Sequence, residues 1–277
     1  MRLALRYLSP LSLVGFAWAS LAWPALAVEP LPRAHAHNDY EHPRPLLDAL
    51  AQGFCSVEAD VYLVEGKLLV AHDLSQVAPE RTLQKLYLDP LRERVKQHGG
   101  SVYAGAPAGF TLLVDIKSEA EPTYIALDRV LAGYEPMLTR FDPEGIKPGA
   151  VTVIISGNRP IPYMTAQTSR RAAVDGRLPD LATKPAASLV PLVSDHWGRQ
   201  FRWNGDGPFP EAEREKLREW VTQAHDQGRR LRFWAVPDRV EAWRVLHEAG
   251  VDLINTDDLQ GLATFLRDTA EGSDLTM

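Results

Sequence analysis

Short apolar stretches rich in β-branched residues alternate with longer amphipathic stretches along the chain after residue 30. Short apolar runs bounded by turn residues are typical of β-strands, whereas the longer stretches repeat apolar residues with helical spacing. The expected strands are residues 33–37, 54–62, 111–116, 150–156, 171–175, 189–194, 231–236 and 251–255. The expected helices include residues 43–52, 119–132, 210–227, 238–249 and 259–269.

The alternation of strands and helices predicts how these elements are arranged. Gly228 and Gly250 each lie just before an expected strand, where the C-cap of the preceding helix belongs. Strands that alternate with helices predict a parallel sheet, and eight repeats in 277 residues favour closure into a single (β/α)8 TIM barrel. Residues 67–71 follow Gly66 and are expected to form an extra strand, paired as a hairpin with the second barrel strand.

The first residues have the pattern of a cleaved signal peptide. Arg2 and Arg6 precede an apolar run over residues 8–22, and the small residues Ala25 and Ala27 suit an export peptidase. Serines and a proline interrupt the run, which is shorter than the roughly 20 apolar residues of a membrane-spanning helix. We therefore expect a mature domain of residues 28–277 that is exported to the periplasm or secreted, with no stable membrane span and at most transient contact with a membrane surface.

The composition and charge of the chain indicate which kinds of molecule it is expected to bind. The chain is 45% hydrophobic and 24% charged, as in an ordinary globular domain, and its formal net charge is −6. This acidity argues against nucleic acid as a partner, because the overall field repels phosphates. The one cysteine, Cys55, lies in an expected strand and is interpreted as a buried thiol, so the fold must be stable without disulfides. No feature indicates an oligomeric state.

Two carboxylates share one face of the second expected strand. Alternate side chains of a strand point to opposite faces, so Glu58 and Asp60 face the barrel lumen while their apolar neighbours face the helices. Two unpaired carboxylates are costly there, and a hard divalent cation, Mg²⁺ or Ca²⁺, would offset their repulsion. A solvated pair of acids facing outward is the alternative.

Further polar side chains are expected at the same end of the barrel, where the active sites of such barrels lie. Asp115 and Lys117 alternate out of the third strand, and they offer a further metal ligand and a cation for a phosphate oxygen, or else an ordinary salt bridge. His72 follows the extra strand, and the hairpin would return it to this end as a general acid or base. Trp234 is expected to roof the pocket, although aromatic residues at this spacing are more often part of a core.

The first expected strand allows two interpretations. His35 and His37 share a face, as does the His-x-His zinc pair of amidohydrolase-like barrels, and His196 and Asp257 at the ends of other strands would complete a zinc site. Against zinc, the fifth strand ends without a histidine, and the acids of the second strand would have no role. Oxygen ligands favour Mg²⁺ or Ca²⁺.

Taken in order, these fragments resemble the superfamily of glycerophosphodiester phosphodiesterases and phosphatidylinositol-specific phospholipases C. The similar segments are Glu58-x-Asp60 and His72-Asp73 of the glycerophosphodiesterases, Asp115-x-Lys117 of the related sphingomyelinase D enzymes, and residues 250–257 as the last barrel strand. The resemblance spans residues 33–266, nearly the whole expected mature chain.

The opening segment resembles a narrower branch. His37-Asn38-x-Tyr40 is similar to the His-Asn-Thr-Tyr segment of the eukaryotic phospholipases, in which the histidine is catalytic and the asparagine is a metal ligand. The His-Arg-Gly start and the Glu-Asn-Thr segment of the glycerophosphodiesterases are absent, and the His-Ala-His-Asn-Asp-Tyr opening looks like the altered inheritance of mitochondria protein six group. The resemblance implies Asn38 as a metal ligand and His37 as the first catalytic histidine, which leaves His35 to substrate binding with Lys117 and Trp234.

The residues and the resemblance together imply a metal-dependent phosphoric diester hydrolase acting on glycerophosphodiesters or (lyso)phospholipid head groups. His37 and His72 would be the acid/base pair, and the cation would be held by Asn38, Glu58, Asp60 and Asp115. Attack by water would give hydrolysis, and attack by a neighbouring substrate hydroxyl would give a cyclic phosphate. Two alternatives stay open, namely a zinc amidohydrolase-like hydrolase and a non-catalytic phosphate-ester binding protein.

Overall fold

The computed structural model describes residues 28–105 and 109–274. The expected signal peptide, residues 1–27, lies outside the described residues. Within the described part of the chain, no helix combines the length and apolar character needed to cross a membrane.

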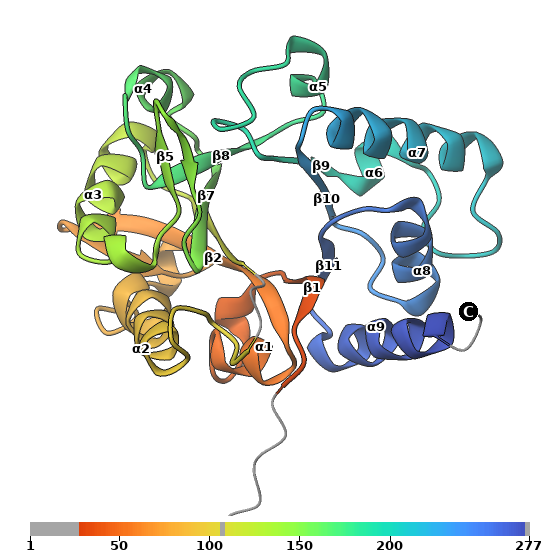
Figure 1. Ribbon diagram of the computed structural model, residues 1–277, viewed down its shortest axis with the longest axis horizontal. Helices are drawn as coiled ribbons and strands as arrows, with labels where there is room; N and C mark the ends of the chain where they lie inside the picture. The colour runs from red at the N-terminus through yellow and green to blue at the C-terminus, as the bar shows by residue number, and fades with distance from the viewer. Residues whose placement is uncertain (1–27, 106–108, 275–277) are drawn as a thin grey trace, which may run out of the picture.

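Eight parallel strands form a ring with helices around its outside (Figure 1), as the sequence predicts. In ring order the strands are β1 (Leu31–Ala36), β2 (Phe54–Val64), β4 (Phe110–Ile116), β7 (Val151–Gly157), β8 (Ala172–Gly176), β9 (Leu192–His196), β10 (Arg230–Trp234) and β11 (Ile254–Thr256). β11 pairs with β1, and a bridge between Arg232 and Leu253 joins β10 to the residue before β11. The sheet is thereby closed into a TIM barrel.

The helices connect successive strands and cover the outer face of the ring (Figure 1). They are α1 (Leu47–Ala51), α2 (Asp89–Gln97), α3 (Ala120–Ala132), α4 (Ile161–Ala166), α5 (Asp180–Thr183), α6 (Trp197–Gln200), α7 (Glu211–Asp226), α8 (Val240–Ala249) and α9 (Leu259–Asp274). Gly228 and Gly250 have φ of 67° and 87°, which confirms that the chain leaves α7 and α8 through left-handed glycines.

The sequence predicts the long elements better than the short ones. Each expected strand overlaps an observed one, although the last strand is shorter and the sixth begins at Leu192. The expected helix over residues 43–52 is reduced to α1, because Leu46 at its N-cap has φ of 64°. A small hairpin of β5 (Arg140–Asp142) and β6 (Gly145–Lys147), outside the ring, is not predicted.

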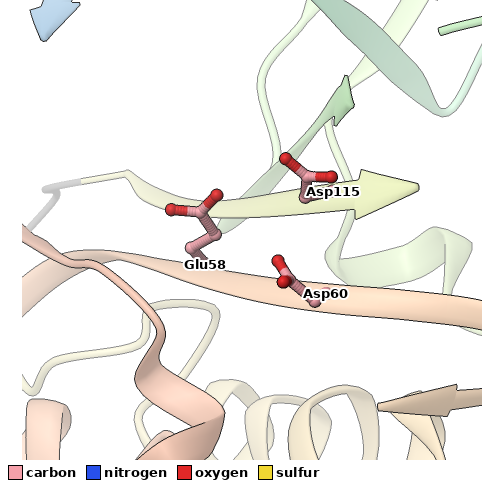
Figure 2. A group of neighbouring side chains, drawn as sticks. All are labelled: Glu58, Asp60 and Asp115. Carbon is pink, nitrogen blue, oxygen red and sulfur yellow. The ribbon is translucent and has the colours of Figure 1, made fainter. Parts of the chain in front are cut away.

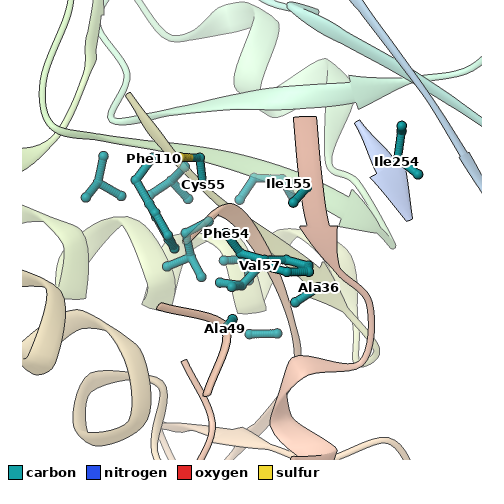
Figure 3. Packing of buried hydrophobic residues seen from close by; sticks show 14 of the residues in the cluster. Ala36, Ala49, Phe54, Cys55, Val57, Phe110, Ile155 and Ile254 are labelled. Carbon is teal, nitrogen blue, oxygen red and sulfur yellow. The ribbon is translucent and has the colours of Figure 1, made fainter. Parts of the chain in front are cut away.

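Apolar side chains pack in two places, outside and inside the ring. Phe54, Cys55, Val57 and Phe110 belong to the main core between strands and helices, shown in part in Figure 3, and burial raises the pKa of the Cys55 thiol to about 12. A second buried cluster consists of Leu113, Ile154, Leu192 and Leu253. Two residues further along each strand, on the same face, lie Asp115, Ser156, Ser194 and Asn255. The lumen therefore changes from an apolar base to a polar mouth at the C-terminal ends of the strands.

The predicted extra strand is confirmed as β3 (Lys67–Val70), which pairs antiparallel with the end of β2. Val64 pairs with Lys67 across Glu65 and Gly66, whose φ values of 49° and 77° are both positive, as a type I′ turn requires. Since Val70 lies opposite Val61, the hairpin returns the chain to the barrel mouth just before His72.

Candidate active site

A cavity of about 210 Å³ opens at the polar end of the barrel. Ten residues line it: His37, Asn38, Glu58, His72, Asp115, Lys117, Ser156, Arg177, Arg232 and Trp234. Seven of these are expected site residues. Of the other two expected residues, Asp60 lies just beneath the wall and is 1% exposed, whereas His35 is fully buried.

Three carboxylates from two neighbouring strands meet at the cavity. Glu58 and Asp60 from β2 and Asp115 from β4 each offer an oxygen within 4.8 Å of the others, and Figure 2 shows the three together. They converge because Asp60 lies opposite Asp115 in the register of the two strands. Burial and the charge of Glu58 raise the pKa of Asp115 to about 6 and also raise that of Asp60. Burial and the charge of Glu58 thus both oppose ionisation of Asp60 and Asp115.

The acidic group fits a hard divalent cation. Oδ1 of Asp60 is buried and has no hydrogen-bond donor among the described residues, so its lone pairs are available to a ligand, whereas the buried Oδ1 of Asp115 faces the ammonium of Lys117. Gly157 at the end of β7 leaves room for this arrangement, because a Cβ there would lie 2.1 Å from Asp115 Oδ1. Oxygen ligands of this kind suit Mg²⁺ or Ca²⁺.

Lys117 lies beside the same acids. Its Nζ is 3.1 Å from Asp60 Oδ2 and 3.2 Å from Asp115 Oδ1. Burial lowers the pKa of Lys117, but the two carboxylates outweigh that effect and the net change is upward, so the side chain carries a positive charge at the cavity wall. Its side chain is 29% exposed and lines the cavity.

Arg232 was not among the expected site residues. It is 2% exposed, donates from Nη2 to Glu58 Oε2 at 2.7 Å, and donates from Nε to Asn255 Oδ1 at 2.9 Å. Although burial raises the pKa of Glu58, the guanidinium outweighs it and holds that pKa well below its usual range. The local signal in the sequence is that Arg232 alternates with Trp234, on the face that the site already occupies.

His35 supports the site from below instead of contacting it. Its Nδ1 lies 2.7 Å from Ser56 Oγ, and its Nε2 is 3.6 Å from Glu58 Oε2, too far for a hydrogen bond. Burial and the charge of Arg232 lower the pKa of His35 to about 3, so the ring is neutral. The expectation that His35 binds substrate does not fit this position, because the ring has no exposed surface.

His37 is anchored by the last strand of the barrel. Its Nδ1 lies 2.8 Å from Asp257 Oδ1, and the backbone N–H of Asp257 donates to Asp238 Oδ2 at 2.8 Å. Burial lowers the pKa of His37, but the hydrogen bond to Asp257 and the charge of Glu58 raise it further, and the net change is upward. Asp257 thus fixes Nδ1 and leaves Nε2 of His37 for the cavity.

His72 and Asn38 are joined through Tyr40. The Tyr40 hydroxyl lies 2.8 Å from Asn38 Oδ1, 2.7 Å from Asp60 Oδ2 and 2.9 Å from His72 Nδ1. His72 itself is 49% exposed, and its Nδ1 is 3.3 Å from Asp60 Oδ2. Asn38 has the left-handed values φ 46° and ψ 35°, which a short polar side chain tolerates. The sequence places these residues near one another but does not predict their contact with Tyr40.

The wall across the ring from β2 carries an aromatic and a basic side chain. The Arg177 guanidinium lies 4.9 Å from the centre of the Trp234 ring, so Trp234 lies at the cavity as expected. Nη1 of Arg177 donates to Asp175 Oδ2 at 2.9 Å, and Ser156 and Ser194 donate to the same buried carboxylate. Arg177 is a second lining residue that the sequence does not predict.

The described residues do not form the zinc site of the alternative interpretation. Among the described residues, the one group of at least three His, Cys, Asp or Glu side chains with mutually close ligand atoms is Glu58, Asp60 and Asp115. His37 pairs with Asp257, but His35 is turned to Ser56, and His196 packs its ring edge against Trp234 with centroids 6.0 Å apart. These side chains do not converge on one point.

The sequence matches the model of the AIM6-like phosphodiesterase domain over residues 26–175 and that of the glycerophosphoryl diester phosphodiesterase family over residues 230–260. The altered inheritance of mitochondria protein 6 homolog of Arthroderma benhamiae is 30% identical over 268 residues, which cover 84% of this chain and 82% of the relative. Altered inheritance of mitochondria protein 6 of Saccharomyces cerevisiae is 29% identical over 280 residues, 84% of this chain and 70% of that protein. A glycerophosphodiester phosphodiesterase structure from Parabacteroides distasonis shares the fold, with a TM-score of 0.52 and 14% identity over 86% of this chain and 98% of that one.

Proposed function

Because the chain belongs to the family of AIM6-like phosphodiesterases, we propose that it is a metal-dependent phosphoric diester hydrolase acting on glycerophosphodiesters or (lyso)phospholipid head groups. The observation that carries the proposal is the cavity itself, which His37, His72 and Lys117 line together with two of the three clustered acids. A phosphodiester needs a base, an acid and positive charge at the phosphoryl oxygens, and these side chains supply them.

The cation would be held by Glu58, Asp60 and Asp115, with the Asn38 amide oxygen as a further ligand. When bound, Mg²⁺ or Ca²⁺ supplies a Lewis acid that neutralises charge on the phosphoryl oxygens. Lys117 adds a point charge from the protein and is free to turn from Asp60 and Asp115 to a phosphoryl oxygen, because a bound cation would take over the neutralisation of both acids.

The two histidines divide the proton transfers. His37, oriented by Asp257, removes the proton from the attacking hydroxyl, which belongs to water or to a neighbouring carbon of the substrate. As the new P–O bond forms and the bond to the leaving alcohol breaks, His72 donates a proton to the departing oxygen. Each transfer contributes about 10²- to 10⁴-fold to the rate.

The test is a phosphorus NMR assay of the purified protein with glycerophosphocholine, a lysophospholipid and bis(p-nitrophenyl) phosphate. We expect turnover with Mg²⁺ or Ca²⁺ and loss of turnover in EDTA. For His72→Ala we expect a fall of about 10²- to 10⁴-fold in kcat on glycerophosphocholine and the lysophospholipid, whose leaving alkoxides need a proton. The spectra also distinguish a linear from a cyclic product.

His225→Ala is the matched control for the histidine. His225 is 44% exposed and its Nε2 lies 2.9 Å from a carboxylate oxygen of Asp252, so it resembles His72 in exposure and partner, but it does not line the cavity. The proposal is wrong if no phosphodiester is cleaved with any divalent metal, or if His72→Ala keeps the wild-type rate. Saturable binding of the esters without turnover would instead support a binding protein.

A further inference from the structure

Tyr40 contacts both the proposed acid, His72, and two of the proposed cation ligands, Asn38 and Asp60. Its ring is 3% exposed, and its hydroxyl has three partners within 2.9 Å, namely Asn38 Oδ1, Asp60 Oδ2 and His72 Nδ1. Each partner comes from a different segment: the turn after β1, the middle of β2 and the residues after β3. No other described hydroxyl contacts both His72 and an acid of the cluster.

The number of hydrogens available indicates which atoms donate and which accept in this contact. A tyrosine hydroxyl carries one hydrogen and accepts through its oxygen, while Asn38 Oδ1 and an ionised Asp60 Oδ2 only accept. Two hydrogen bonds form when the hydroxyl donates to one of these oxygens and His72 Nδ1–H donates to the hydroxyl, whereas only one forms when the hydroxyl donates to His72 Nδ1. The first arrangement makes His72 Nδ1 the donor.

A second contact of His72 Nδ1 also indicates that this nitrogen is a hydrogen-bond donor. His72 Nδ1 also lies 3.3 Å from Asp60 Oδ2, another acceptor, so both neighbours favour a hydrogen on Nδ1. The rings of Tyr40 and His72 are nearly parallel, with an interplanar angle of 18°, which keeps the imidazole edge turned towards the hydroxyl. With Nδ1 used in this way, Nε2 is the nitrogen that is left for the cavity.

We propose that Tyr40 is a positioning residue, whose hydroxyl accepts the Nδ1–H of His72 and thereby ties the orientation of that imidazole to the ligands Asn38 and Asp60. The catalytic part of this inference rests on the proposed function, and the structural part does not. During turnover Tyr40 keeps its proton and stays off the substrate; it acts through His72, which exchanges its proton at Nε2.

The structural part is tested by nitrogen-15 NMR of the imidazoles in the metal-free protein, with His72→Gln to assign the resonance. We expect neutral His72 to carry its hydrogen on Nδ1 in the wild type, and to shift towards the Nε2–H form in Tyr40→Phe. An Nε2–H form in the wild type overturns the proposal. An unchanged tautomer in Tyr40→Phe also overturns it, since Asp60 alone would then orient the ring.

The catalytic part is tested by changing the leaving group. Tyr40→Phe should lower kcat by about 10- to 100-fold on glycerophosphocholine, whose alkoxide needs a proton, with little change in KM. On bis(p-nitrophenyl) phosphate the loss should be much smaller, because nitrophenolate leaves without protonation. Equal losses on both substrates would mean that Tyr40 is merely structural and would overturn the proposal.

Tyr103→Phe is the matched control. Tyr103 is 1% exposed and its hydroxyl donates to the carbonyl of Phe54 at 2.6 Å, so this variant also loses a buried hydrogen bond, but away from the cavity. We expect it to leave both rates and the His72 resonance unchanged. A wild type without turnover would overturn the proposed function, while the NMR result would still decide the role of Tyr40.

Discussion

Asp39 lies beside the site but faces away from it, into the protein. Its side chain is fully buried, and its Oδ2 accepts hydrogen bonds from the Leu46 backbone N–H at 2.5 Å and the Tyr87 hydroxyl at 2.9 Å. Its Oδ1 has no hydrogen-bond donor among the described residues. Burial raises the pKa of Asp39 to about 7, so the folded protein holds this proton more tightly than the unfolded chain does.

The raised pKa of Asp39 predicts how stability depends on pH. Because the folded pKa is above the unfolded value of 3.8, the stabilising contribution is complete below pH 3.8 and is lost as pH rises through 7. Between pH 4 and 8, the free energy of unfolding of the wild type relative to Asp39→Asn should therefore fall by on the order of a few kcal/mol. Urea denaturation at a series of pH values measures this difference. A constant difference would contradict the prediction.

Local pattern predicts some site residues and not others. Glu58, Asp60 and Asp115 are recognisable because strand alternation alone turns them towards the lumen. Arg232 contacts Glu58 across 174 positions of sequence, and a core arginine has no local signature that names such a partner. Tyr40 is visible in the opening motif, but its contact with His72 depends on where the β2–β3 hairpin brings the chain back.

At the scale of elements, the sequence predicts the long strands but not the short ones, again because only the long ones have a local pattern. The barrel strands are predicted because each contributes a run of buried apolar residues, and in β7 four of the seven residues are apolar and fully buried. β5 and β6 have three residues each, and β6 is exposed along its length, so neither leaves an apolar pattern. The four-residue helices α5 and α6 are too short to show helical periodicity.

The end of β7 shapes the proposed cation site through a missing side chain. Gly157 has φ of 65°, and a Cβ there would lie 2.1 Å from Asp115 Oδ1 and 2.6 Å from the Ile116 carbonyl oxygen. Gly157→Ala should therefore displace the Asp115 carboxylate and weaken Mg²⁺ or Ca²⁺ binding by about 10- to 100-fold, as measured by calorimetry.

Gly207→Ala is the control for this substitution. Gly207 has φ of 66° but has nothing within 4 Å of an added Cβ. Gly207→Ala should lose about 1 kcal/mol of stability from the strained backbone and keep its cation affinity. Gly157→Ala should lose more stability, because its Cβ also meets the Ile116 carbonyl oxygen, and it alone should lose cation affinity. Equal affinities in the two variants would show that the room at Gly157 is not needed.

At the scale of the whole molecule, the Arg232–Glu58 pair crosses the lumen between β10 and β2. Both side chains are at least 92% buried, and Arg232 also takes part in the β-bridge to Leu253 that closes the ring. Arg232→Met should reduce the free energy of unfolding by about 3–5 kcal/mol, because it leaves the Glu58 charge buried and unpaired. Adding Glu58→Gln should restore part of that loss.

A double-mutant cycle in urea measures this coupling. The exposed pair Arg239–Asp206, with side chains 46% and 71% exposed, is the comparison, and its coupling should lie in the range of about 0–1 kcal/mol. If the Arg232–Glu58 coupling is no larger than that of the exposed pair, the buried ion pair does not hold the two sides of the barrel together.

The contact between His37 and Asp257 joins positions 220 apart in sequence. During synthesis the acids, Lys117 and His72 all leave the ribosome before residue 118, whereas Asp257 emerges only after the last barrel strand, β11. A nascent or prematurely terminated chain would thus hold all three clustered carboxylates and still lack the Asp257 anchor of His37. Under the proposed function, chemistry would wait until the last barrel strand has been made and has paired with the first.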